Sequence, residues 1–183
     1  SSASDWFYIN YGPSQTDSAD TFITQTRAAG AQAFITVPTI GWAPNLAAVP
    51  GWGYSVAKYG PQNLVEANWG GSGNTDAGNG ECGTANTTGH CVNGKIVGND
   101  PLDTSIAVGP AFQAQWIAHL QGLFGTAANG GVRHYALDNE VMLWNSTHRD
   151  VHPAPATYDE IWQKTVAYAS AIKAQDPGAL ITG

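Results

Sequence analysis

The sequence has 183 residues, enough for one domain with a hydrophobic core, and we treat residues 1–183 as a single segment. Only 11% of the residues are charged, against 43% that are hydrophobic, a composition common in secreted proteins whose solubility depends on neutral polar side chains. The formal net charge of −7 repels phosphate backbones and anionic lipids, and no apolar run is long enough to span a bilayer, so we expect neither a nucleic-acid nor a membrane partner.

Three predicted helices alternate with three predicted strands. The helices are expected over 18–29, over 110–125 and from Thr157 onward. Short apolar runs typical of buried strands follow them, at Ala33–Val37, Val132–Leu137 and Ala179–Thr182. The first two helices end at glycines, Pro110 suits a first helical turn, and Thr157 with Glu160 forms a capping box. This alternation implies right-handed crossovers, so we expect the strands to be adjacent and parallel in an α/β fold.

Two cysteines, Cys82 and Cys91, lie in the long polar insert at 39–103 that follows the first strand. Two cysteines alone cannot complete a four-ligand zinc site, and their spacing is not that of a C-x-x-C redox motif. Two free thiols are the alternative to a bonded pair. We predict a disulfide, and with it an oxidising compartment, so the protein is expected to be secreted and extracellular.

The segment Asp138-Asn139-Glu140 directly follows the second strand and opens another polar insert. Active sites of parallel sheets are built at the carboxyl ends of the strands. Cleavage of a glycosidic bond needs one carboxylic acid to protonate the leaving oxygen and a second carboxylate as nucleophile or base. Glu140 can serve as that acid, and Asn139 can donate its amide to a sugar hydroxyl. The alternative is that Asp138 and Glu140 are solvated carboxylates at the start of a loop.

The wider sequence resembles glycoside hydrolase family 44, which comprises secreted endo-β-1,4-glucanases and xyloglucanases. The segments that carry the resemblance are Tyr135–Glu140, Leu143–Pro153, Ile35–Pro38, Tyr54–Gln62 and Gly130–Arg133. They extend over nearly the whole chain in the family's order. The resemblance implies a retaining hydrolase whose catalytic domain is a (β/α)8 TIM barrel with long loops at the strand C-termini, accompanied by a β-sandwich. This chain would be an incomplete, central portion of that barrel.

The resemblance assigns Glu140 as the acid/base after the fourth barrel strand. It places the nucleophile after the seventh strand, outside this chain, and Glu66, Glu81 and Glu160 do not fit that role. One departure is Val141, because the family usually has proline after the acid/base. We therefore expect hydrolysis of internal β-1,4-glucosidic bonds in cellulose-type glycans or xyloglucan by a complete enzyme and none by the isolated chain.

The expected partners are a β-glucan polysaccharide and the remainder of the chain's own barrel. Two other interpretations stay open: a non-catalytic carbohydrate-binding module, and an interaction or misfolding-prone fragment that needs its missing half. The preferred glucan depends in part on loops from other strands.

Several tryptophans lie in or next to the inserts, where flat rings could stack on the apolar faces of glucose units: Trp42, Trp52, Trp69 and Trp144. Trp42 and Trp144 are the better candidates, with packing of the loop as an equal alternative for both. Trp116 and Trp162 fall on predicted helices, so we expect them to pack in the core or on a helix face.

Metal binding has weak support in the sequence. A structural calcium ion is chemically compatible with the carboxylates of the first insert, namely Asp76, Glu81, Asp100 and Asp103. No ligand spacing supports it, so we expect no cofactor. His148 and His152 are expected to hydrogen-bond their loop rather than bind a metal.

Overall fold

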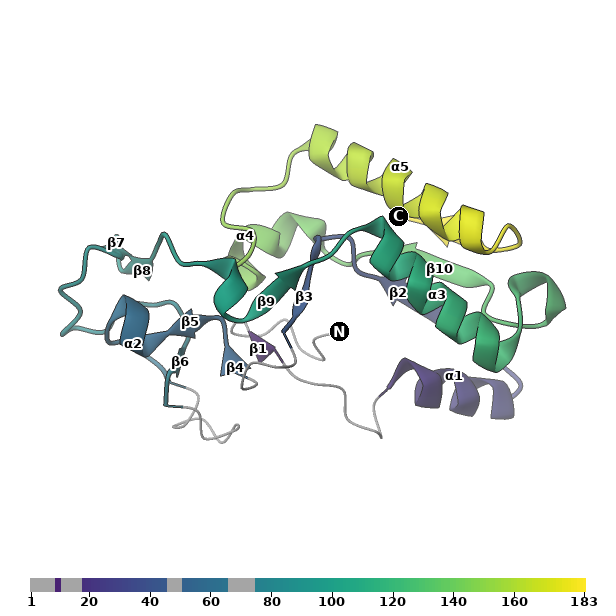
Figure 1. Ribbon diagram of the computed structural model, residues 1–183, viewed down its shortest axis with the longest axis horizontal. Helices are drawn as coiled ribbons and strands as arrows, with labels where there is room; N and C mark the ends of the chain where they lie inside the picture. The colour runs from purple at the N-terminus through teal and green to yellow at the C-terminus, as the bar shows by residue number, and fades with distance from the viewer. Residues whose placement is uncertain (1–8, 11–17, 46–50, 66–74) are drawn as a thin grey trace. The chain divides into compact units, whose positions relative to one another are not determined.

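The structure is a computed structural model that describes residues 9–10, 18–45, 51–65 and 75–183 (Figure 1). The chain forms two compact units. We call residues 13–42, 108–142 and 156–183 the sheet unit, and residues 1–12, 43–107 and 143–155 the insert unit. The interpretation of the whole chain as one portion of a larger catalytic domain stays a prediction.

The sheet unit is built on three parallel strands. They are β2 (Phe34–Val37), β10 (His134–Leu137) and β11 (Leu180–Thr182), in the order β11-β10-β2. Tyr135 in the central strand lies opposite Ile35 on one side and Ile181 on the other. The prediction of adjacent parallel strands is confirmed.

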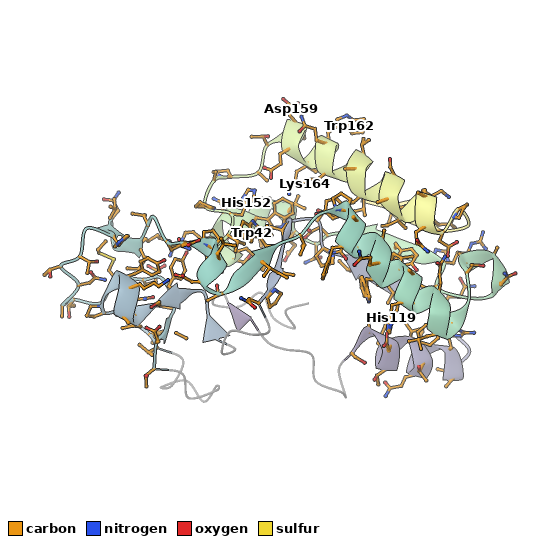
Figure 2. All side chains as sticks on the ribbon, viewed as in Figure 1. Trp42, His119, His152, Asp159, Trp162 and Lys164 are labelled. Carbon is orange, nitrogen blue, oxygen red and sulfur yellow. A yellow bond between two sulfur atoms is a disulfide. The ribbon has the colours of Figure 1, made fainter. Side chains whose placement is uncertain are left out.

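Three helices accompany these strands: α1 (Ala19–Ala28), α3 (Pro110–Phe124) and α5 (Tyr158–Gln175). Their starts follow the sequence signals, since the Ser18 hydroxyl accepts the Thr21 N–H and the Thr157 hydroxyl accepts the Glu160 N–H. His119 of α3 also contacts Asp20 of α1 at 2.9 Å (Figure 2). None of the described helices has the length and apolar character that a bilayer crossing requires.

One face of the sheet packs against the helices. Alternate strand residues enter a core that includes Ile23, Ile35, Val37, Ile117, Leu120, Tyr135, Leu137, Tyr168 and Ile172. The other strand residues point to the opposite face, where Phe34 and Leu180 lie on either side of His134. Their side chains are 55% and 47% exposed. The described residues therefore cover the sheet fully on one face only.

The buried side of α3 differs from the one that its apolar residues suggest. The run of Phe112, Trp116, Leu120 and Leu123 suggests one buried stripe on α3, but Phe112 and Leu123 are 43% and 55% exposed. The buried residues of α3 are instead Gln113, Ile117 and Leu120. Because α3 is apolar on several sides, the side that meets the sheet determines which residues are buried. Trp116 does pack partly against the core.

The expectation that Trp162 packs in the core or on a helix face is wrong, because Trp162 is 68% exposed. Figure 2 labels this residue on α5. It shares the outer side of α5 with Tyr158, which is 96% exposed. The buried residues of α5 are Tyr168 and Ile172, which lie further along the helix.

The insert unit consists of short elements. Its antiparallel pairs are β1 (Ile9–Asn10) with β4 (Gly51–Trp52), β5 (Tyr54–Ser55) with β6 (Ala77–Gly78), and β7 (Cys91–Val92) with β8 (Lys95–Ile96). A further pair joins β3 (Trp42–Pro44) to β9 (Ser105–Ala107), and the short helices are α2 (Val56–Tyr59) and α4 (Trp144–Thr147). The 3-10 turns at Ala127–Asn129 and Val141–Leu143 lie wholly or mostly in the sheet unit, whereas a single 3-10 turn at Pro101–Asp103 belongs to the insert unit. With so little regular structure, this unit depends on side-chain interactions.

Arg149 connects several segments of the insert unit. Its guanidinium is buried, donates to the carbonyl of Ile96 at 2.5 Å and to that of Gly80 at 2.8 Å, and lies 5.0 Å from the centre of the Tyr54 ring. Tyr54 and Ile96 are themselves fully buried in the unit's small hydrophobic cluster. A planar cation with several donors is suited to joining loops in this way. Part of the family motif after Glu140 therefore has a structural role.

A disulfide joins Cys82 and Cys91, as predicted, and closes the loop before β8. Replacing both cysteines by alanine should lower the free energy of unfolding by about 2–3 kcal/mol, because the unfolded chain regains the freedom of that loop. Urea denaturation of the two proteins measures this difference. Thiol labelling of the unfolded native chain should find no free cysteine before reduction and both afterwards. Two labelled thiols before reduction would contradict the bond.

Candidate active site

The chain reverses direction immediately after β10. Asp138 and Glu140 both adopt left-handed backbone conformations, with φ of 59° and 49°. Such conformations are uncommon for residues other than glycine and cost on the order of 1 kcal/mol each, so they persist where surrounding contacts hold them. The Asp138 N–H still donates to the carbonyl of Val37 at 2.8 Å, which ties the start of the turn to β2.

The Asp138 carboxylate holds this turn. Its Oδ2 accepts the Thr39 N–H at 2.6 Å and the Thr39 hydroxyl at 3.0 Å, while Oδ1 accepts the N–H of Asn139 at 2.8 Å. Thr39 is buried, so the first two bonds are shielded from water. Asp138 is therefore not a freely solvated carboxylate, which was one of the two interpretations of the sequence. It connects the segment after β2 to the turn that carries Glu140.

Two helices fix the segment after β2. The buried Gln113 of α3 donates to the carbonyl of Pro38 at 3.1 Å. Lys164 extends from α5 and donates through Nζ to the carbonyls of Thr39 at 3.0 Å and Ile40 at 2.8 Å (Figure 2). Burial lowers the pKa of Lys164, and the carboxylates of Glu160 and Asp138 oppose that effect.

Sequence reasoning missed Thr39 and Lys164. The one available signal was that Lys164 lies between Ile161 and Tyr168 on the side of α5 that faces the core, where a lysine needs acceptors. The sequence does not show which acceptors these are, because they lie more than 120 residues away along the chain.

Glu140 and Asn139 are exposed at the end of the turn. The amide nitrogen of Asn139 lies 3.4 Å from Oε2 of Glu140. The structure thus brings these two predicted site residues together beside the carboxyl end of β10. An accessible carboxyl group next to an amide donor can exchange a proton with a bound sugar while the amide binds a hydroxyl.

The predicted tryptophans do not all take part. Trp42 begins β3 and is only partly buried. Trp144 is 2% exposed, and its ring packs against His152 with 5.1 Å between ring centres. Packing, the alternative left open for Trp144, is the role that the structure shows. Trp69 and Glu66 lie outside the described residues, as does the side chain of Trp52.

The carboxylates considered for calcium have other partners. Asp76 accepts the hydroxyl of Ser55, and Asp103 pairs with Lys58. Among the residues that the structure describes, no group of three or more histidine, cysteine, aspartate or glutamate side chains could hold a metal ion. His152 donates its backbone N–H to the carbonyl of His148 at 2.7 Å, so the two histidines share one hydrogen-bonded loop.

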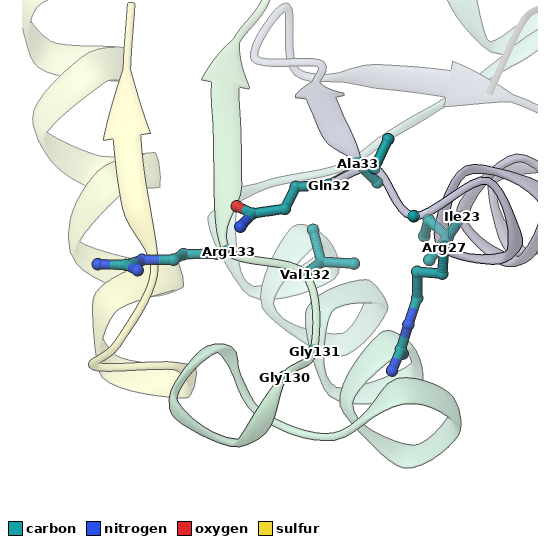
Figure 3. Close-up of a pocket in the computed structure, with 10 residues that line it drawn as sticks. Ile23, Arg27, Gln32, Ala33, Gly130, Gly131, Val132 and Arg133 are labelled. Atoms are coloured by element: carbon teal, nitrogen blue, oxygen red, sulfur yellow. The ribbon is translucent and has the colours of Figure 1, made fainter.

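A hollow of about 250 Å³ lies at the other end of the strands (Figure 3). It is lined by Ile23, Arg27, Gly30, Ala31, Gln32, Ala33, Gly130, Gly131, Val132 and Arg133. These residues precede β2 and β10, whereas the turn with Glu140 follows β10. None of the lining residues carries a carboxylate, so this hollow cannot supply the acid that glycoside cleavage needs.

A helix-covered parallel sheet with an exposed Asn-Glu pair just past a strand has the architecture of an α/β glycoside hydrolase. Comparison with known families agrees and goes further. The chain belongs to glycoside hydrolase family 44, whose family model matches residues 1–183.

Solved structures and curated sequences support this membership. The structure of CelM2, a bifunctional glucanase-xylanase from a metagenome library, is 43% identical with a TM-score of 0.84 over 98% of this chain. A family 44 endoglucanase from Clostridium thermocellum shares the fold, at 20% identity and a TM-score of 0.56 over 90% of the chain. Beta-mannanase/endoglucanase A of Caldicellulosiruptor saccharolyticus is 38% identical over 73 residues, which are 39% of this chain and 6% of that protein.

The chain spans only part of these relatives. It covers 33% of CelM2 and 28% of the Clostridium thermocellum endoglucanase. The chain therefore belongs to the family, but this membership alone does not establish the activity of a complete enzyme.

Proposed function

We propose that this chain supplies the acid/base, Glu140, of a retaining endo-β-1,4-glycanase, and that it forms part of a (β/α)8 barrel. The observation that carries the proposal is the turn after β10, which presents the exposed carboxyl group of Glu140 at the carboxyl end of a parallel strand. Retaining glycosidases place the acid/base and a nucleophilic carboxylate about 5 Å apart across the scissile bond.

In this mechanism Glu140 acts twice. As a carboxylic acid it donates a proton to the glycosidic oxygen while the nucleophile attacks the anomeric carbon and the sugar leaving group departs. As a carboxylate it then removes a proton from the water that cleaves the glycosyl-enzyme ester. Asn139 is assigned to a sugar hydroxyl near the reacting carbon, and Trp42 to a platform for a neighbouring sugar ring.

The nucleophile is assigned to residues outside these 183. The described glutamates other than Glu140 are engaged elsewhere: Glu81 pairs with Lys95 at 3.5 Å, and Glu160 lies in the first turn of α5, 3.8 Å from Lys164. Neither follows a strand of the parallel sheet.

The uncovered face of the sheet supports the barrel. Phe34, His134 and Leu180 form a row across the three strands on the face opposite the helices. In a (β/α)8 barrel this row would point into the closed interior, where the remaining strands would cover it. The remainder of the chain's own barrel is therefore its proposed structural partner.

The proposed substrate is a neutral β-1,4-linked glycan of the cellulose or xyloglucan type. Two relatives are named for glucanase or endoglucanase activity, one of them with xylanase activity as well. The net charge of −7 disfavours acidic polysaccharides. The disulfide favours a secreted, extracellular enzyme, where such polymers occur.

Stereochemistry tests the proposed mechanism. The complete enzyme should cleave β-1,4-glucan oligosaccharides with the β-anomer as the first product, because two displacements at the anomeric carbon restore its configuration. Proton NMR during the first minutes of hydrolysis distinguishes the anomers before they interconvert. The 183-residue chain alone, assayed as a control, should release no sugar. Initial formation of the α-anomer, or binding of glucan without any hydrolysis by the complete enzyme, would overturn the proposal.

A further inference from the structure

We propose that Lys164 and Thr39 are positioning residues that set the direction of the Glu140 carboxyl group through Asp138. The inference rests on the function proposed above for Glu140. The positioning device is a series of hydrogen bonds that begins at Lys164 in α5, passes through the segment after β2 and ends at the turn after β10. All of its members belong to the sheet unit.

The first part of the device is a fixed backbone segment. Lys164 donates to the two successive carbonyls of Thr39 and Ile40, and the next residue, Gly41, accepts the N–H of Val108 at 2.9 Å. Gly41 has a φ of 95°, and a Cβ there would lie 3.4 Å from Nζ of Lys164. The ammonium group therefore lies directly against the backbone beside Gly41.

The second part of the device connects the fixed segment after β2 to the turn after β10. Thr39 holds Oδ2 of Asp138 with both its N–H and its hydroxyl, and Oδ1 of the same carboxylate holds the N–H of Asn139. Asp138 and Glu140 both have positive φ, a backbone conformation that is strained for residues other than glycine. The hydrogen bonds of the Asp138 carboxylate hold the turn in this conformation. Loosening the bonds to Thr39 would let the residues after Asp138 rotate.

The exposure of Glu140 makes its direction depend on the backbone. A buried side chain is oriented by its neighbours, but Glu140 is exposed, and its hydrogen bond to the Asn139 amide is long, at 3.4 Å. A general acid must meet the leaving oxygen at hydrogen-bond distance, and a displacement of about 1 Å can cost about 100-fold in rate. Holding the turn is thus a direct way to hold the acid.

Lys173 offers a matched control on the same helix. Its Nζ also donates to two backbone carbonyls, those of Pro177 and Ala179. These carbonyls precede β11, at the end of the strands opposite Glu140. Replacing either lysine by methionine removes a charge and two backbone hydrogen bonds but keeps most of the aliphatic side chain. Lys164→Met also removes the contact of 3.8 Å with Glu160.

The test compares Lys164→Met with Lys173→Met in the complete enzyme. Lys164→Met should lower kcat on β-glucan by about 10- to 100-fold with KM changed less than about twofold, because binding is kept and proton donation is misdirected. On an aryl β-cellobioside whose leaving group needs no proton, kcat/KM reports only the first displacement, so it should fall about threefold or less. Lys173→Met should change both substrates equally and slightly, and Lys164→Arg should recover most of the lost activity.

Thr39→Val provides a second test if Lys164→Met folds poorly. It removes the hydroxyl bond to Asp138 and keeps the N–H bond, so a smaller loss with the same dependence on the leaving group is expected, and Thr39→Ser should restore activity. Equal losses of kcat/KM on both substrates, or an effect of Lys164→Met no larger than that of Lys173→Met, would refute the positioning role. If Glu140→Gln also leaves activity intact, the proposed function fails as well; if it abolishes activity, only the positioning role fails.

Discussion

Glu140→Gln in the complete enzyme is expected to lower kcat on β-glucan by about 10²- to 10⁴-fold, the usual contribution of general acid catalysis. Glutamine has nearly the same shape as glutamate but cannot donate an acidic proton to the glycosidic oxygen. The fold should be unaffected, because Glu140 is exposed and does not belong to the hydrophobic core. Circular dichroism and the melting temperature verify that the variant stays folded.

The pattern of the loss identifies the role of Glu140. Activity on a substrate whose leaving group departs without protonation should fall much less in the first step, and the covalent intermediate should then accumulate. Azide is a nucleophile that needs no general base, so adding it should restore turnover and yield a β-glycosyl azide. Glu81→Gln is the control, since it makes the same chemical change in the insert unit. An unaffected Glu140→Gln enzyme would remove Glu140 from the site.

The three strands and three helices of the sheet unit were predictable because their signals are local. The capping residues Ser18 and Thr157 lie within a few residues of the N–H groups they accept, and each strand is a short apolar run. The buried side of α3 was not predictable in the same way. Gln113 is buried there because it bonds to the carbonyl of Pro38, which is 75 residues away. Hydrophobicity alone would place such a polar side chain outside.

Some residues of the candidate site were likewise predictable from the sequence, and others were not. Glu140 and Asn139 were found because a family motif and a strand end coincide at one place in the sequence. Thr39 and Asp138 are separated by 99 residues, and Lys164 and Thr39 by 125, so the register of β2 against β10 and the placement of α5 had to be known first. The exposure of Trp162 likewise depends on which side of α5 meets the sheet.

Asp150→Asn is expected to remove a pH dependence of stability from the insert unit. Burial raises the pKa of the Asp150 carboxyl group to about 7, an effect that the N–H groups of Asp150 and Val151 and the charge of Arg149 only partly offset. The backbone of Gly53 lies against it so closely that a Cβ there would come within 2.7 Å of the Cβ of Asp150. Water therefore has little access to the carboxylate.

The direction of the effect follows from where the proton binds. Between pH 4 and pH 7 the folded chain keeps a proton on Asp150 that the unfolded chain, with a carboxyl pKa near its ordinary 3.8, has lost. The contribution of Asp150 to the free energy of unfolding should therefore be largest below pH 4, fall as the pH rises, and level off above pH 7. A shift of this size corresponds to at most about 4 kcal/mol across that range. Asparagine has no proton to lose, so Asp150→Asn should lack this component.

The measurement is chemical denaturation of the native and Asp150→Asn proteins at several pH values from 4 to 8. Every other ionisable group is common to both proteins, so the difference between the two curves isolates the Asp150 carboxyl group. Relative to the native protein, the variant should gain stability steadily as the pH rises from 4 to 7. Asp159→Asn, an exposed aspartate of α5, controls for the loss of one negative charge. A difference that stays constant with pH would show that Asp150 is ionised in the folded protein throughout, and that its burial does not hold the proton.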